Sequence, residues 1–158
     1  MMKIDKPGLM TVALSITILT VIIVSVTYFF VTRKMLIGPI LIILGMISLI
    51  PVILSRISIR ILKAEILFGV IDNGILAVFA LSGAELFGIL GAIVGSLVGN
   101  AVTDGIAGIF EGYEWQKTTE LKTKNKRNAL TVAVGKLAGC LLGAGVVLTI
   151  AWSILNLF

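Results

Sequence analysis

The feature that most constrains this chain is a series of five long apolar runs. They cover residues 9–32, 35–55, 64–84, 86–110 and 128–157. A helix crosses the hydrocarbon core of a bilayer with roughly 20 apolar residues. With a mean hydropathy of +1.15 and 13% charged residues, the chain has too little polar surface to cover a soluble globule. The runs also lack the period-two alternation of membrane β-barrels. We therefore expect an all-α polytopic bundle of five transmembrane helices in a lipid bilayer, with residues 1–158 forming a single membrane domain.

The distribution of basic residues predicts the orientation of this bundle. Most of the 13 basic residues fall on one side of the predicted membrane, namely Lys3, Lys6, Arg56, Arg60, Lys63, Lys117, Lys122, Lys124, Lys126 and Arg127. Only Arg33 and Lys34 fall on the other side, and Lys136 lies inside the last run. The positive-inside rule then places the N-terminus in the cytoplasm. The net charge of +5 is explained by topology and contact with anionic lipid, so we expect no nucleic-acid partner.

Three charged residues from three runs are expected at a similar depth in the membrane. Asp72 and Lys136 each lie eight residues into their runs, and Asp104 lies six residues before the end of its run. At a rise of 1.5 Å per residue these positions are about 9–12 Å from the cytoplasmic ends. Asn73 and Asn100 lie near the same level. Ionisable residues inside a membrane face protein or water, and mark ion pathways or paired charges.

These residues suggest an oxygen-lined cation site. Ser96, Asn100 and Asp104 are spaced four residues apart on one helical face, and Glu111 follows near its cytoplasmic end. The candidate ion-binding residues are Asp72, Asn73, Asn100, Thr103, Asp104 and Glu111. Their oxygens suit Na⁺, Ca²⁺ or Mg²⁺, whereas the absence of histidine and the single cysteine argue against zinc or copper.

Lys136 provides an alternative explanation for the buried acids. It is the expected charge partner of Asp72 or Asp104, and such a salt bridge inside the bundle is a purely structural arrangement. Two carboxylates and one ammonium still leave one negative charge. That surplus favours a cation site.

Glycines at intervals of four predict close helix packing. The fourth run carries Gly91, Gly95 and Gly99, and the fifth carries Gly135, Gly139 and Gly143. Such seams allow close backbone approach, so we expect tight helix pairs and a homodimer built around these two runs. The glycines in "DNG" (72–74) and "TDG" (103–105) allow two interpretations: a helix broken at an ion site, as in some transporters, or an intact helix with small packing residues.

Part of the chain resembles the transmembrane protein 65 family, whose eukaryotic members are mitochondrial inner-membrane proteins. The similarity covers about residues 67–150 and is carried by Phe68, Gly69, Asp72, Asn73, Gly99, Asn100, Thr103, Asp104, Gly108, Glu111, Gly135, Lys136, Gly139 and Cys140. The family is implicated in sodium-dependent calcium efflux. The resemblance implies a Na⁺/Ca²⁺ site at Asp72, Asn73, Asn100 and Asp104.

The same resemblance divides the chain into two parts. Residues 64–158 correspond to a three-helix family core, and residues 1–63 form two accessory helices without a counterpart in it. No mitochondrial targeting sequence is visible, so we expect a multi-pass protein of a prokaryotic cell membrane.

Three classes of function follow from these features. The first is a cation transporter, most simply a Na⁺/Ca²⁺ exchanger-like antiporter. The second is a non-transporting scaffold or regulator of ion handling, in which the buried charges are structural. An enzyme, such as a small membrane kinase, is not expected because the sequence has no Walker-type phosphate loop and no nucleophile–base pair. We accordingly expect no cofactor beyond bound or transported Ca²⁺ and Na⁺.

Overall fold

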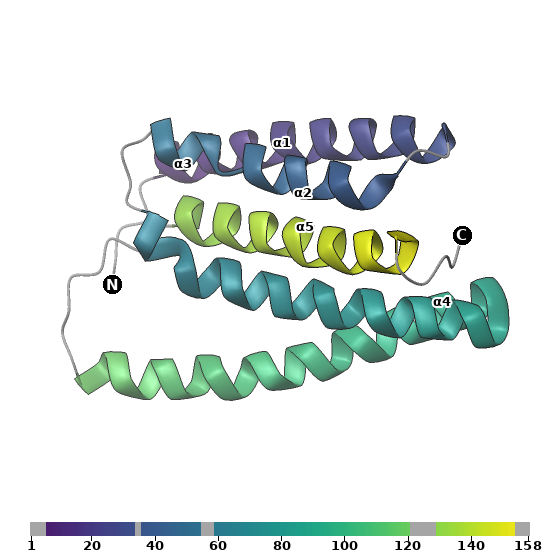
Figure 1. Cartoon of the computed structure of the whole chain (residues 1–158). Coiled ribbons are helices and arrows are strands. Elements are labelled where there is room, and N and C mark those ends of the chain that lie inside the picture. The colour runs from purple at the N-terminus through teal and green to yellow at the C-terminus, as the bar shows by residue number, and fades with distance from the viewer. Residues whose placement is uncertain (1–5, 34–35, 55–58, 121–128, 154–158) are drawn as a thin grey trace.

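The computed structural model describes residues 6–33, 36–54, 59–120 and 129–153 (Figure 1). Its elements are α1 (Lys6–Thr32), α2 (Ile37–Ile47), α3 (Ile50–Leu54), the short 3₁₀ helix η1 (Ile59–Leu62), α4 (Lys63–Glu120) and α5 (Ala129–Ser153). The helices lie side by side along one common direction (Figure 1). The prediction of an all-α bundle is confirmed for the residues that the structure describes.

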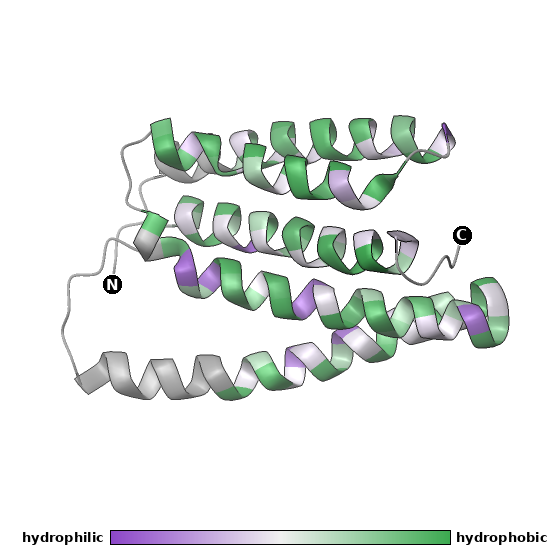
Figure 2. Cartoon of the chain, in the orientation of Figure 1, coloured by the Kyte–Doolittle hydropathy of each residue, from purple (hydrophilic) through white to green (hydrophobic). Residues whose placement is uncertain are grey.

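Four helical stretches in the described part of the chain are long and apolar enough to cross a membrane. They are Ala13–Thr32, Ile37–Leu54, Lys63–Ile109 and Ala129–Ser153. Most of the ribbon is hydrophobic, and hydrophilic patches interrupt both halves of α4 (Figure 2). The predicted membrane protein is therefore supported, whereas the count of five separate transmembrane helices is not confirmed.

The difference in number arises because α4 folds back on itself. Its helical geometry is interrupted at Phe87 (φ −136°, ψ 16°) and Gly88 (φ 62°, ψ −144°). Gly88 adopts a backbone conformation that is essentially restricted to glycine, since a Cβ is strained there. We refer to residues 63–86 as the first half of α4 and to residues 89–120 as its second half. The turn lies next to the boundary predicted between the third and fourth apolar runs.

The two halves of α4 pack against each other in antiparallel orientation near the turn. A Cβ added at Gly91 would overlap the backbone of Gly83, and one added at Gly95 would overlap the backbone of Phe79. Farther from the turn, Gly99 lies against Leu76. The first predicted glycine seam thus joins the two halves of α4 within one chain.

Helix α5 lies between α2 and the first half of α4 (Figure 1). Gly135 packs against Glu65, and Gly143 packs against Val70, so α5 and the first half of α4 run in parallel. Between them, a Cβ at Gly139 would overlap the carbonyl oxygen of Ile66. The second predicted seam is therefore also used inside the chain, and neither seam is left over to support the expected homodimer.

Helix α2 contacts α5 more closely than its apolar sequence suggested. The sequence analysis predicted only two accessory helices in residues 1–63, outside the three-helix core. Instead, Gly38 of α2 lies against Thr149 and Gly145 of α5, and Gly45 lies against Leu142. Buried Leu41 and Leu44 extend this contact. Small residues bring α2 close to the backbone of α5, so α2 is a packed part of the bundle.

Helix α4 remains intact at both glycine-containing motifs, "DNG" and "TDG". The segments 72–74 and 103–105 lie in α4, whose non-helical positions are Phe87 and Gly88. The interpretation of "DNG" and "TDG" as helix breaks is wrong for this structure. A Cβ added at Gly74 or Gly105 would meet no atom of the described residues within 4 Å, so both glycines leave space beside the helix.

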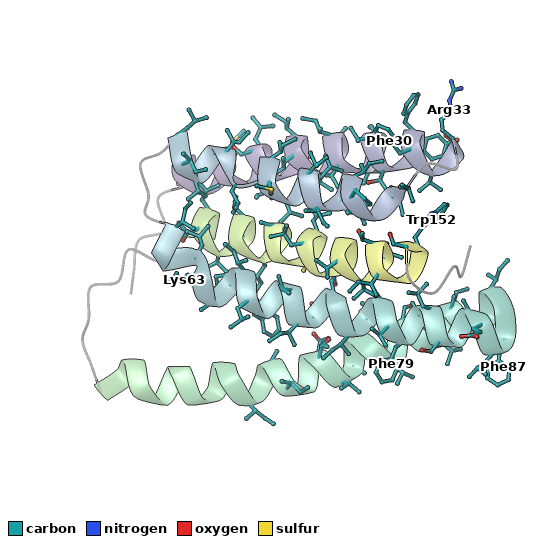
Figure 3. The ribbon with its side chains drawn as sticks, viewed as in Figure 1. Phe30, Arg33, Lys63, Phe79, Phe87 and Trp152 are labelled. Carbon is teal, nitrogen blue, oxygen red and sulfur yellow. The ribbon has the colours of Figure 1, made fainter. Side chains whose placement is uncertain are left out.

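The two ends of the bundle differ in side chains. Phe30, Arg33 and Trp152 lie at the end opposite Lys63, and Phe87 lies at the turn of α4 (Figure 3). The guanidinium carbon of Arg33 is 5.4 Å from the ring centroid of Phe29.

Many of the basic residues that predict the orientation fall in 1–5, 34–35, 55–58 and 121–128, outside the described residues. The cytoplasmic N-terminus therefore stays a prediction.

The contact at Gly139 leads to a stability prediction. Gly139→Ala should lower the free energy of unfolding in detergent by about 1–3 kcal/mol, because the new methyl group forces apart two backbones in contact. Gly74→Ala is the matched control, since a Cβ at Gly74 meets no atom within 4 Å. Thermal melting followed by size-exclusion chromatography measures both variants, and equal melting temperatures would contradict the packing described here.

Candidate functional site

Asp72 lies half-buried on the first half of α4, close to α5. Its carboxylate oxygen Oδ1 is buried and has no hydrogen-bond partner among the described residues. Gly69, one turn earlier, is in backbone contact with Gly139 and Cys140 of α5. A buried carboxylate oxygen without a partner is costly, and a proton or a cation relieves that cost.

Lys136 of α5 faces the same interface but at a different level. Its ammonium nitrogen is 5.0 Å from the ring centroid of Phe68, in the geometry of a cation–π contact. Its neighbour Gly135 packs against Glu65, two turns before Asp72. The equal depth expected for Lys136 and Asp72 is therefore not found, because glycine contacts set the register between the helices. The Lys136 ammonium is therefore beside Phe68, which precedes Asp72 by one helical turn.

Glu65 is a buried acid that the sequence analysis missed. It is 5% exposed and packs against Gly135. Glu65, Phe68 and Asp72 recur at intervals of three and four, which places them on one face of the helix. That spacing was visible in the sequence, but Glu65 stands at the start of its apolar run and resembled a boundary residue. The Phe68 ring, which contacts the Lys136 ammonium, thus lies between Glu65 and Asp72 along this face of the helix.

Asn100 and Asp104 form a direct pair on the second half of α4. The amide nitrogen Nδ2 of Asn100 donates a hydrogen bond of 2.9 Å to Oδ2 of Asp104. The hydroxyl of Thr103 donates to the carbonyl oxygen of Asn100 at 3.0 Å, and Thr103 is 2% exposed. Asn100 and Asp104 are themselves exposed. The proximity expected for the pair is found, but the pair faces out of the chain.

The structure therefore brings only some of the predicted ion ligands to one place. Continuing the antiparallel register of Leu76 and Gly99 brings Asp72 and Asn73 level with Thr103. Asn73 is half-buried, in contrast to exposed Asn100 and Asp104. Within the part of the chain that the structure describes, no group of three or more His, Cys, Asp or Glu residues is placed to hold a metal ion. Glu111 belongs to α4, and its side chain lies outside the described residues.

Comparison with known proteins gives no independent identification. No family model matches the chain, and neither a curated protein nor a solved structure matches it. The resemblance to the transmembrane protein 65 family accordingly stays a prediction. The assignment of function depends on the chemistry of the residues described above.

The position of Lys136 leads to a prediction that separates charge from packing. Lys136→Met should lower the free energy of unfolding by about 1–3 kcal/mol, because it removes the ammonium group from an interface that contains two acids. Lys136→Arg retains the charge and the cation–π contact, so it should melt within a few degrees of the wild type. Melting curves recorded at several pH values test this. Identical curves for all three proteins would remove Lys136 from the site.

Proposed function

We propose that this protein is a membrane cation transporter, most simply a Na⁺/Ca²⁺ exchanger-like antiporter of a prokaryotic cell membrane. The observation that carries the proposal is the buried oxygen of Asp72, which lacks a hydrogen-bond partner among the described residues. In this proposal the two halves of α4 cross the membrane separately, giving five crossings with a cytoplasmic N-terminus. The resemblance to the transmembrane protein 65 family supports the same ions.

The proposed ligands are hard oxygen donors. Asp72 and Asn73 supply a carboxylate and an amide from the first half of α4, and Thr103 supplies a hydroxyl at the same level from the second half. Calcium takes six to eight oxygens, which include water. An incomplete protein shell leaves part of the ion hydrated. Such a shell releases its ion readily, as a transporter requires.

The turn of α4 provides a physical route for exchange. The two halves are in backbone contact near Gly88 and diverge away from it (Figure 1). In our proposal, a change in the angle between them alters the distance between the carboxylate of Asp72 and the hydroxyl of Thr103. The site is then tight or loose, and Na⁺ and Ca²⁺ compete for it.

A scaffold or regulator of ion handling is the second candidate. The observation that favours it is the ammonium of Lys136 beside Phe68, one turn from Asp72. In that case Lys136 neutralises the buried acids and no ion needs to enter. The two candidates differ in whether the carboxylates are needed for ion movement or only for stability.

Substitution of the two acids tests the transporter directly. Asp72→Asn and Asp104→Asn keep the side-chain volume but remove a charged ligand. We expect each to reduce Ca²⁺ uptake into liposomes under a Na⁺ gradient by roughly tenfold or more, the equivalent of losing one charge-assisted contact. Glu85→Gln is the control, because Glu85 is an exposed acid near the turn of α4.

Folding must be retained for this test to count. Each variant should elute as a single peak at the wild-type volume. If correctly folded Asp72→Asn and Asp104→Asn proteins both transport at the wild-type rate, the buried acids are structural and the scaffold is the better account.

A further inference from the structure

Over residues 98–109, the exposed surface of the second half of α4 has two unlike sides. One side carries branched apolar residues, with Val98, Val102 and Ile109 exposed by 46%, 43% and 74%. The other side carries Asn100, Ala101, Asp104 and Gly108, all of them exposed. We call these four residues the outer polar face. At 3.6 residues per turn the two sides are separate, and both lie away from the buried stripe that contains Thr103.

Lipid suits the first side of this helix but not the outer polar face. Acyl chains offer no hydrogen bonds, and a carboxylate exposed to them is costly. The bond from Asn100 to Asp104 uses one amide N–H and one carboxylate oxygen. The second amide N–H, the amide oxygen of Asn100 and the second oxygen of Asp104 have no hydrogen bond among the described residues. The outer polar face therefore requires a polar partner.

The glycine of this face also has no packing contact with the part of the chain that the structure describes. A Cβ at Gly108 would meet no atom within 4 Å, and the same holds for neighbouring Gly105. In contrast, Gly91, Gly95 and Gly99 of the same half are in contact with the first half of α4. Gly108 and Ala101 thus leave room for a second helix to approach closely.

We propose that a second copy of this chain covers the outer polar face. Two copies inserted in the same orientation bring their second halves of α4 together in parallel, so equal residues meet across a two-fold axis. Asn100 is suited to this arrangement, because its amide is both donor and acceptor and pairs with its own symmetry mate. The homodimer interface is therefore this face, and not the glycine seams that the sequence suggested.

The same arrangement creates a composite cation site. Two Asp104 carboxylates face each other across the axis, flanked by two Asn100 amides. Like charges at short range repel, and a cation between them relieves the repulsion. Two carboxylates and two amide oxygens are ligands suited to Na⁺ or Ca²⁺. This deepens the proposed function and rests on it, since the second copy completes an oxygen shell around the Asp104 carboxylate.

Disulfide cross-linking in liposomes tests the interface. The variants Ala101→Cys and Val102→Cys, each combined with Cys140→Ser, place one thiol on adjacent sides of the same helix. Under copper–phenanthroline oxidation, Ala101→Cys should yield a covalent dimer on denaturing gels and Val102→Cys should remain monomeric. Gly108→Cys is a second reporter on the outer polar face. Monomers at both Ala101→Cys and Gly108→Cys, or equal cross-linking at Val102→Cys, would overturn the proposed interface.

The cation dependence of cross-linking tests the composite site. Addition of Ca²⁺ should increase the cross-linking rate of Ala101→Cys, and Asp104→Asn in the same background should cross-link equally fast with and without Ca²⁺. A dimer whose cross-linking ignores Ca²⁺ would overturn the composite site. A wild-type protein that transports Ca²⁺ while its cysteine variants stay monomeric would refute the interface and leave the proposed transport intact.

Discussion

Direct contact between helix backbones at glycine is the interaction on which the rest of this structure depends. In a bilayer, hydrophobic burial does not drive helices together, so close packing must do so. Gly139 lies against Ile66 and Gly69, and Gly145 of the same helix lies against Ile42 of α2. Helix α5 is therefore held by backbone contacts on two sides. Asp72 and Lys136 are positioned by these contacts.

The turn at Gly88 is the second determinant of the arrangement. A straight helix of 58 residues would be about 87 Å long, far more than a bilayer is thick. Because the chain reverses there, residues far apart in the sequence come to one level, as Leu76 and Gly99, which are 23 positions apart, show. The polar residues on both halves of α4 thus depend on one glycine conformation for their shared depth.

The sequence predicted the positions of the helices well, but it predicted less well which surfaces pack against each other. Hydropathy identified the helical segments, and a spacing of four residues predicted the pair of Asn100 and Asp104. Helical periodicity defines a face of a helix, but it does not define what that face meets. For that reason the outward direction of Asn100 and Asp104, and the contact of Gly38 with α5, were not predicted. The level of Lys136 was also misjudged, since counting from the start of a run ignores the register that glycine contacts impose.

Direct binding of Ca²⁺ to the purified protein in nanodiscs is the measurement that tests the central claim, a cation site formed by intramembrane oxygens. The account predicts saturable binding of radioactive Ca²⁺ that is displaced by Na⁺ but not by choline, and that is absent when Asp72→Asn and Asp104→Asn are combined. Binding that does not saturate, or saturable binding that survives in the folded double variant, would contradict it.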